Sequence, residues 1–374
     1  MTAQPTTSTG RPPTGRPYEW LSEDDRKAVE TPSWSKGFLI AAVHFALYFA
    51  TLYLAIGPFP LWANIIGGFV NGFALGLLFI IGHDCVHKCF FPNLRANQIM
   101  GRLTFLPSAH SASLWEAGHN RFHHGKTNFK GVDYVWTPMS VEEYRAAGPA
   151  RRFVERLNRG LIGQVFNYPV TIWLPKLILP VAREVRAQWK RYAWDSVLVV
   201  VGHGAIIAGI LALGKMWNPE ASYLAIFAVA WLLPMIVWNF LASFSFFLHH
   251  AHEDQHWFDK PEEWSFYQSA IEGTTHLEIP ALKWLGLYYN VMEHSAHHAL
   301  STIPIYHLDK AGKLLRAHYG DAVTAYEFSF RDYFRILKAC KLYDFRNHQW
   351  TDFEGRPTGP ALHERRAPAL AAAE

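Results

Sequence analysis

Histidine is the residue type whose number and spacing point most directly to chemistry in this chain. The sequence has 20 histidines in 374 residues but only three cysteines. Neutral imidazole is a ligand for iron, zinc and copper, so grouped histidines indicate a metal site that needs no thiolate. Twelve of the histidines fall in four clusters, which lie at residues 83–87, 119–124, 249–256 and 294–298.

The spacing within the clusters predicts shared helix faces. His83 and His87 are four residues apart, and on a helix they lie on one face about one turn apart. The same holds for His119 and His123. Two such imidazoles can bind one ion, and a neighbouring third can reach a second ion from a rotated angle. Two clusters have this third histidine: His119, His123 and His124, and His294, His297 and His298.

The number of imidazoles predicts two metal ions. Eight or nine candidate ligands exceed what one ion takes, since a zinc ion binds about four. No cluster of thiolates or carboxylates joins them, although Asp84 and Glu293 are candidates for orienting the ring N–H groups. A redox metal pair beside a membrane indicates oxygen chemistry on a lipid. The histidines outside the clusters are interpreted as packing or surface residues.

Long apolar segments must position these clusters. Only 18% of the residues are charged, against about 25% in soluble domains. Four apolar runs are each long enough for a helix that crosses the hydrocarbon core, and together they are too many to bury in a soluble core. We therefore expect an all-α integral membrane protein, with two helical hairpins and a cytoplasmic helical cap that holds a His-rich two-metal site. The expected membrane helices are about 37–56, 61–82, 196–214 and 223–248.

The distribution of positive charge predicts the topology. The loops 57–60 and 215–222 carry almost no positive charge, so they are expected outside, with all the histidine clusters on the cytoplasmic side. A fifth apolar run, 161–182, contains three prolines and has basic residues on both flanks, which favours a position in the membrane interface over a crossing. The net charge of +4 is spread along the chain and predicts no nucleic-acid partner. The expected organisation is a tail over 1–35, a single membrane domain over 36–350 and a second tail over 351–374.

The histidine clusters and the segments around them resemble the membrane fatty acid desaturases. The patterns HxxxH, HxxxHH and HxxHH are matched by residues 83–87, 119–124 and 294–298. Further similarity, to the acyl-lipid Δ12 and ω3 desaturases of cyanobacteria and plastids, lies in residues 81–91, 105–107, 126–128, 133–138, 273–276 and 301–308. The resemblance covers about residues 35–345. One difference is Val86, where those enzymes usually have glycine, and a valine there would narrow the space beside an acyl chain.

The resemblance implies an O₂-dependent enzyme that introduces a cis double bond into an acyl chain of a membrane lipid, at the Δ12 or ω3 position. It implies two iron ions as the cofactor and O₂ as the co-substrate. A histidine near the end of the fourth membrane helix is implied as an extra ligand, for which His250 is chosen and His249 and His252 are alternatives. The implied metal ligands are His83, His87, His119, His123, His124, His250, His294, His297 and His298.

The same resemblance implies partners and leaves alternatives open. The chain has no His-Pro-Gly-Gly haem motif and no Rossmann glycine fingerprint, so an external electron donor, ferredoxin or cytochrome b5, is expected. A hydroxylase or an acetylenase on the same scaffold is the first alternative, and a metal-handling membrane protein is a remote one. The expected location is a bacterial inner membrane. Candidate walls of an acyl tunnel are Trp115, Phe122, Trp136 and Trp238.

Overall fold

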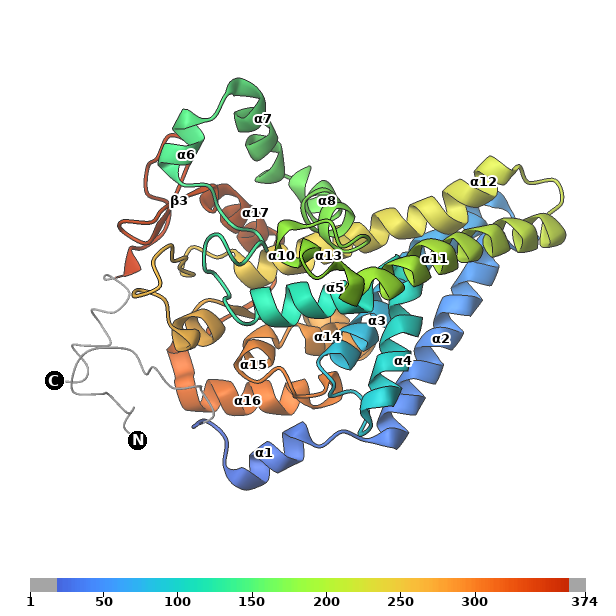
Figure 1. Cartoon of the computed structure of the whole chain (residues 1–374), viewed down its shortest axis with the longest axis horizontal. Helices are drawn as coiled ribbons and strands as arrows, with labels where there is room; N and C mark the ends of the chain where they lie inside the picture. The colour runs from blue at the N-terminus through green and yellow to red at the C-terminus, as the bar shows by residue number, and fades with distance from the viewer. Residues whose placement is uncertain (1–18, 363–374) are drawn as a thin grey trace.

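Four long apolar helices form one end of the molecule, and a cap of shorter helices forms the other. The computed structural model describes residues 19–362. Four helices are long and apolar enough to cross a membrane, which confirms the predicted all-α membrane architecture. Figure 1 shows these helices side by side, extending away from the cap. They are α2 (Trp34–Ile56), α3 (Leu61–Val86), α11 (Trp189–Trp217) and a continuous helix made of α12 (Tyr223–Phe227), η4 (Ala228–Leu232) and α13 (Leu233–His250).

Polar side chains within the first hairpin bond to backbone that lipid cannot satisfy. The Asn64 side chain donates to the carbonyls of Leu54 (2.8 Å) and Gly57 (3.1 Å), where α2 ends. Two turns further along α3, the Asn71 amide donates to the carbonyl of Tyr48 on α2 (2.9 Å). Because water is absent from the bilayer core, each of these bonds ties α3 to α2 at a defined register.

Helix α3 is the central span. Within its apolar window 72% of the residues are buried, against 22% for α11, so α3 is packed by protein where α11 faces outward. Small residues allow the close approach: a Cβ on Gly72 would lie 2.5 Å from the Cβ of Val237 on α13, and one on Gly68 would overlap the carbonyl oxygen of Val229. Small residues at four-residue spacing are the usual means by which membrane helices pack closely.

The segment that follows α3, made of α4 and η1, packs back against the membrane helices. Helix α4 (Leu94–Phe105) packs along α3, and the Phe105 ring lies 4.8 Å from that of Phe79. The following turn, η1 (Leu106–Ser108), lies against the middle of α11, where His203 contacts the Leu106 carbonyl (3.0 Å). Phe105 and Leu106 thus pack this part of the chain against α3 and α11.

The predicted interfacial run 161–182 is broken into short helices in the structure. Three prolines lie within it, and proline removes a backbone donor, so the run forms no helix of membrane-spanning length. Its first helix packs against α13, where the backbone N–H of Tyr168 donates to the Ser243 hydroxyl (3.0 Å). The elements in and around the run are α7 (Pro149–Asn158), α8 (Gly163–Asn167), η3 (Tyr168–Trp173), α9 (Leu174–Lys176) and α10 (Arg183–Arg186).

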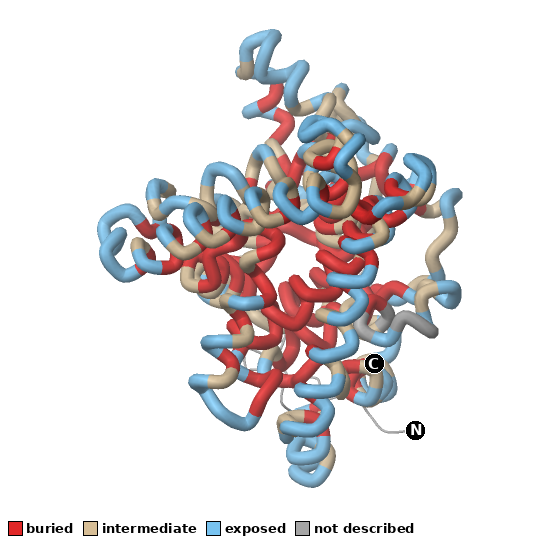
Figure 2. The backbone as a smooth tube through the Cα atoms, turned by 90° about the vertical axis from the view of Figure 1, so that its right-hand side faces the viewer, coloured by how far each residue is buried: buried red, intermediate tan, exposed pale blue. Residues whose placement is uncertain are grey.

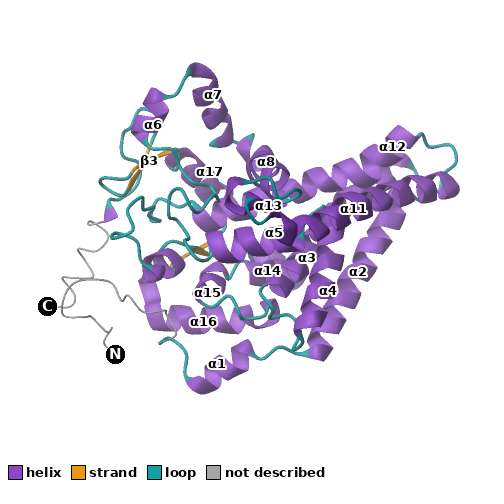
Figure 3. Cartoon of the chain, in the orientation of Figure 1, coloured by secondary structure: helices purple, strands orange, loops and turns teal. Residues whose placement is uncertain are grey.

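The cap is assembled from segments on both sides of the second hairpin. Figure 3 shows it as short helices, loops and a few strands. Strands β1 (Thr275–Glu278) and β2 (Thr324–Glu327) pair in parallel, and β3 (Leu342–Asp344) and β4 (Gln349–Thr351) pair antiparallel. The remaining helices are α1 (Glu23–Glu30), α5 (Ala112–Trp115), η2 (Glu116–His123), α6 (Val141–Ala146), η5 (Gln268–Glu272), η6 (Pro280–Leu285), α14 (Leu287–Val291), α15 (His294–Ala299), η7 (Ile305–His307), α16 (Leu308–Tyr319), η8 (Gly320–Ala322) and α17 (Phe330–Ala339).

Buried residues are concentrated where the membrane helices meet the cap. Figure 2 shows this region in red at the middle of the molecule, with exposed segments around it. The histidine clusters lie here: His83 is in the last turn of α3, and His250 is the last residue of α13. Residues 1–18 and 363–374, which belong to the expected tails, lie outside the described residues, whereas α1 and the start of α2 fall within the range expected as the N-terminal tail.

Candidate metal centre

Nine buried histidines form two adjacent groups at the junction of spans and cap. Within each group, one ring nitrogen from every residue lies within 4.8 Å of one from each of the others. The members are exactly the nine that the sequence analysis named. The first group is His83, His87, His119, His124 and His297, and the second is His123, His250, His294 and His298.

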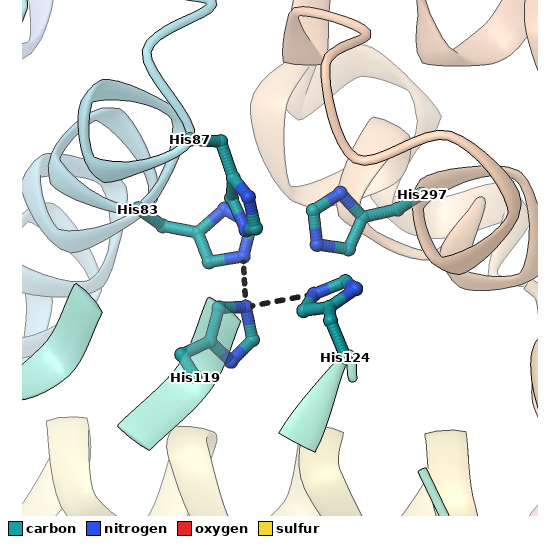
Figure 4. Close-up of side chains that lie close together, drawn as sticks. All are labelled: His83, His87, His119, His124 and His297. Atoms are coloured by element: carbon teal, nitrogen blue, oxygen red, sulfur yellow. Dashed lines mark hydrogen bonds between the residues drawn. The ribbon is translucent and has the colours of Figure 1, made fainter. Parts of the chain in front are cut away.

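The first group is built from three segments that are distant in sequence. Figure 4 shows its five rings pointing toward one another from α3 and the residue after it, from the second cluster, and from α15. His83 and His87 are one turn apart at the end of α3, with ring centroids 4.8 Å apart, as their spacing predicts. His297 completes the group from α15.

The second cluster does not follow an ordinary α-helical face. Residues 116–123 form a π-helical turn, and the N–H of His124 donates to the carbonyl of His119, five residues back (2.9 Å). The α-helical spacing rule therefore does not describe this cluster, although the rings of His119 and His123 remain stacked with centroids 5.4 Å apart. His119 shares its group with His124, and His123 turns to the other group. A π-helical turn adds one residue per turn and so aligns residues five apart.

In the fourth cluster the α-helical rule holds. His294 and His298, four residues apart on α15, belong to the second group, and His297 between them belongs to the first. One short helix therefore contributes to both groups. The two groups are in contact through several ring pairs, among them His124 and His298, whose centroids are 4.1 Å apart.

Hydrogen-bond partners behind the rings fix which nitrogen points inward. The carboxylate of Asp84 lies 3.2 Å from Nδ1 of His83, and the carboxylate of Asp133 lies 3.0 Å from Nδ1 of His123. A carboxylate can only accept here, so Nδ1 carries the proton and Nε2 keeps its lone pair for the centre of the group. Asp84 was predicted to orient a ring, whereas Asp133 was missed.

The position of Asp133 could have been found from sequence, because it is a carboxylate in the loop directly after a histidine cluster. The loop is turned tightly, with φ of +56° at Asn128 and +85° at Gly131. The Asn128 N–H donates to the second oxygen of Asp133 (2.9 Å), and the Val135 N–H donates to the first (3.0 Å). The carboxylate is therefore held by the backbone on both sides.

A hydroxyl orients His298 in the same way. The Thr127 hydroxyl donates its only proton to the carbonyl of His123 (2.7 Å), so toward any other group it can only accept. The contact of 3.1 Å between Thr127 Oγ1 and Nδ1 of His298 is then donated by the histidine. Nε2 of His298, which is buried and has no hydrogen-bond partner, is left with its lone pair facing inward.

Glu293, the other predicted orienting acid, serves a different purpose. Its carboxylate lies 2.6 Å from the Arg316 guanidinium and 2.9 Å from Nδ1 of His276, and its side chain is 1% exposed. Its backbone carbonyl accepts the N–H of His297 (3.1 Å). Glu293 therefore fixes the start of α15 rather than the orientation of a ring in either group.

The donor set fits a pair of metal ions. Nε2 of His119 lies 2.8 Å from Nε2 of His83 and 3.1 Å from Nε2 of His124, the contacts dashed in Figure 4. With the His83 proton held on Nδ1 by Asp84, Nε2 of His83 can only accept, so whichever tautomer His119 takes, at least one of these two contacts lacks a proton of its own. That arrangement is unfavourable for rings alone and favourable around a cation. Both nitrogens of His297 are likewise buried without a hydrogen-bond partner.

The electrostatics keep the rings neutral. Burial, and then repulsion by neighbouring histidines, hold the pKa values of His119, His124 and His298 well below the ordinary value. A neutral imidazole is the form that binds a metal. The buried thiols of Cys85 and Cys89 are nearby in sequence but belong to neither group, so the donors are nitrogen throughout.

The alternatives for the extra ligand are separated by position. His250 lies in the second group, with its Nε2 2.9 Å from Nε2 of His294. His249 lies beside that group with its ring stacked on His294 at 4.0 Å. His252 lies further along, with its ring 5.2 Å from that of Tyr326.

Buried aromatic residues pack beside the first group. Trp115 stacks on the His119 ring at 4.9 Å, and Phe79 lies 4.8 Å from Trp115 and 4.4 Å from Trp238. These rings form a packed row from the histidines toward α3 and α13, which carry Phe79 and Trp238. Trp136 instead packs on Phe247, at 5.1 Å.

Comparison with known proteins finds similarity over the part of the chain that contains both histidine groups. A family model described as fatty acid desaturase matches residues 60–330. An sn-1 oleoyl-lipid 12-desaturase of Picosynechococcus is 28% identical over 350 residues, which cover 89% of this chain and 88% of the relative. A chloroplastic omega-6 fatty acid desaturase of Arabidopsis thaliana is 28% identical over 88% of this chain and 68% of the relative. An sn-1 oleoyl-lipid 12-desaturase of Synechocystis is 28% identical over 78% of this chain and 79% of the relative.

Proposed function

The chain belongs to the fatty acid desaturase family, and from that membership we propose that it introduces a cis double bond at the Δ12 position of an acyl chain in a membrane lipid. That it is a fatty acyl desaturase of the membrane follows from the family and the four spans. The observation that carries the proposal is the convergence of nine buried imidazoles into two adjacent groups at one end of those spans. Relatives named as 12-desaturases and omega-6 desaturases support Δ12 over ω3.

We assign the two histidine groups as the ligands of two iron ions. The group of five is His83, His87, His119, His124 and His297, and the group of four is His123, His250, His294 and His298. When bound, such a pair supplies the activation of O₂ and the removal of hydrogen from two neighbouring methylene carbons. In the balanced reaction the acyl chain gives two hydrogens, a donor gives two electrons with two protons, and O₂ becomes two waters.

The protein's own residues orient the ligands and exclude bulk water. Asp84 and Asp133 hold the Nδ1 protons of His83 and His123, so that these rings cannot turn away from the centre. Each named ligand is at most 9% exposed, which keeps solvent from a reactive centre.

Positioning of the acyl chain is assigned to the aromatic walls between α3 and α13. A methylene in an apolar pocket offers only about 1–3 kcal/mol of discrimination, so the depth of the chain must be set by the shape of the pocket. Trp115 and Trp238 are placed to form these walls, next to the first histidine group. Val86 is buried at the end of α3, next to His87, and is proposed to narrow the space available to the chain.

The electrons come from an external donor, for which a ferredoxin or a cytochrome b5 is proposed. The location proposed is a bacterial inner membrane with the histidines on the cytoplasmic side, as the weakly charged loops 57–60 and 215–222 favour. A hydroxylase or acetylenase would share the same hydrogen removal. A metal-handling protein would need clusters along a path through the spans, whereas both groups lie at one end of them.

The test is lipid analysis of a host that supplies monounsaturated acyl chains and expresses the chain. Gas chromatography of the fatty acids, with derivatisation to locate the double bond, should reveal a diene with its new bond at the Δ12 position. A bond at ω3 would correct the position, and a hydroxy or acetylenic product would correct the reaction. Unchanged lipids together with altered metal uptake would overturn the proposal.

A further inference from the structure

Two large apolar side chains are exposed on the outer side of α17, although this helix lies outside the four spans. Its inner face is buried through Tyr333, Ile336 and Leu337. On its outer face, Phe330 is 73% exposed and Phe334, one turn later, is 50% exposed. Two phenylalanines at i and i+4 share one side of a helix, and a pair of this size facing water marks an interaction surface.

A continuous row of aromatic rings connects this face to the lipid-facing surface of a membrane helix. Phe240 on α13 is exposed and stacks on Phe244 at 5.7 Å, and Phe244 contacts Phe328 at 5.8 Å. Phe328 in turn contacts Phe330 at 5.4 Å. In Figure 1, α17 lies next to the end of α13 that carries the histidines. The outer face of α17 therefore continues the surface that α13 presents to the bilayer.

The charges on α17 fit the headgroup region of a membrane. Arg331 and Lys338 are exposed, and neither has an ion pair with any residue of the described range 19–362. The helix has one carboxylate, Asp332, which is already bonded to Ser329 and Arg335. Phenylalanines flanked by unpaired cations are the composition of helices that lie in the interface of an anionic bilayer.

We propose that α17 lies on the bilayer surface at the histidine end of the spans, with Phe330 and Phe334 among the lipid chains and Arg331 and Lys338 at anionic headgroups. The partner is thus the phospholipid surface itself. This inference goes beyond the proposed reaction and does not depend on the identity of the metal.

Such seating would also support the metal centre. Arg335 on α17 forms an ion pair with Glu253, which follows His250 by three residues. The N–H of Phe328, just before α17, donates to the carbonyl of Glu278 on β1 (2.7 Å). A helix held at the membrane surface therefore holds the segment that leaves α13, at the point where that segment contributes a histidine to the second group.

Spin labelling of the whole protein in vesicles tests the depth of α17. The natural cysteines Cys85, Cys89 and Cys340 are buried, so a label at Phe334→Cys can be placed selectively. In vesicles of phosphatidylcholine and phosphatidylglycerol, we expect this label to collide with oxygen more often than with a water-soluble nickel chelate. The matched control is Lys313→Cys on α16, whose side chain is 66% exposed and which should favour the nickel chelate.

The charge component is tested with the same label. Raising the phosphatidylglycerol fraction should move the Phe334→Cys label deeper, and the pair Arg331→Glu with Lys338→Glu should abolish that shift. Arg346→Glu, which changes an exposed cation on the β3–β4 turn, should leave it intact. Nickel accessibility at position 334 equal to that at 313 would overturn the proposal. A label shielded from both reagents would also overturn it, because the face would then be covered by protein, either a second copy or another partner.

Discussion

At the scale of single residues, the acids behind the histidines are as informative as the histidines themselves. The Asp133 carboxylate accepts a hydrogen bond from Nδ1 of His123 and two more from backbone N–H groups, so it cannot move without rebuilding the loop. Asp84 holds His83 and accepts the N–H of Ile305 (2.5 Å), which links the first cluster to the segment after the fourth. Each acid thus orients a proposed ligand and joins two distant parts of the chain.

The first prediction concerns a ligand that lies in the group of five. His297→Ala should abolish formation of the new double bond and lower the iron content, because both nitrogens of His297 are buried with no hydrogen-bond partner to compensate for a lost ion. Bound iron is measured on purified protein and the product by gas chromatography. His318→Ala, an exposed histidine on α16, is the control and should leave both values unchanged. Full activity with full iron in His297→Ala would refute the ligand assignment.

The second prediction concerns the acid that sequence reasoning missed. Asp133→Asn keeps the size of the side chain but no longer provides a charged acceptor for Nδ1 of His123. We expect iron affinity to fall by about 10–100-fold, the range typical for partners behind a metal ligand. Competition with a chelator measures it, and Asp344→Asn on β3 serves as the control. Wild-type iron retention in Asp133→Asn would show that the carboxylate has no orienting role.

At the scale of elements, short helices distribute the ligands between the two groups. The π-helical turn η2 sends His119 and His123 to different groups, and α15 places His294 and His297 in different groups one turn apart. The position of α15 depends on Glu293 at its start, which is packed between Arg316 and Gly312 of α16. The approach of α16 is so close that no side chain fits at position 312.

The third prediction tests that close approach. A Cβ at position 312 would lie 1.7 Å from Oε2 of Glu293. Gly312→Ala should therefore displace Glu293 and α15, and it should destabilise the protein by about 1–3 kcal/mol, as overpacking usually does. Thermal unfolding in detergent measures the loss. Gly209→Ala on α11, where no atom lies within 4 Å of an added Cβ, should not destabilise. Equal midpoints for the two variants would mean that α16 can shift freely.

At the scale of the whole molecule, four spans hold two buried groups of histidines at one end of the membrane region. Burial lowers the pKa values of many rings at once, among them His119, His124, His294, His297 and His298. In the unfolded chain these rings would titrate at about 6.5. The metal-free protein therefore keeps its full stability above that pH and loses stability as the pH falls below it, because only the unfolded chain then takes up protons.

The fourth prediction follows from this dependence. Between about pH 7.5 and about pH 5.5, the unfolding midpoint of the metal-free protein should fall, and each ring contributes up to about 1.4 kcal/mol per pH unit below its unfolded pKa. His297→Gln removes one such ring and should make the dependence shallower. His318→Gln, at the surface, should not change the slope. Identical slopes for wild type and His297→Gln would contradict the assignment of a neutral buried ring at position 297.

The sequence by itself determined the four spans, the histidine patterns and eight of the nine gathered imidazoles. These are local properties: the length of an apolar run decides whether it can cross a bilayer, and the spacing of histidines decides whether they can share a helix turn. His250 could be preferred over His249 from sequence only through resemblance to a known family.

Only the tertiary structure decided how the imidazoles divide into five and four, and which groups orient them. The π-helical turn at His119 depends on the residues that pack around it, and the spacing of the histidines does not predict it. Glu293 was expected behind a ring but supports α15 instead, because Arg316 of α16 lies within 2.6 Å of it. Contacts between segments far apart in sequence choose among the arrangements that local spacing permits, so the histidines that lie together could be predicted from the sequence and their geometry could not.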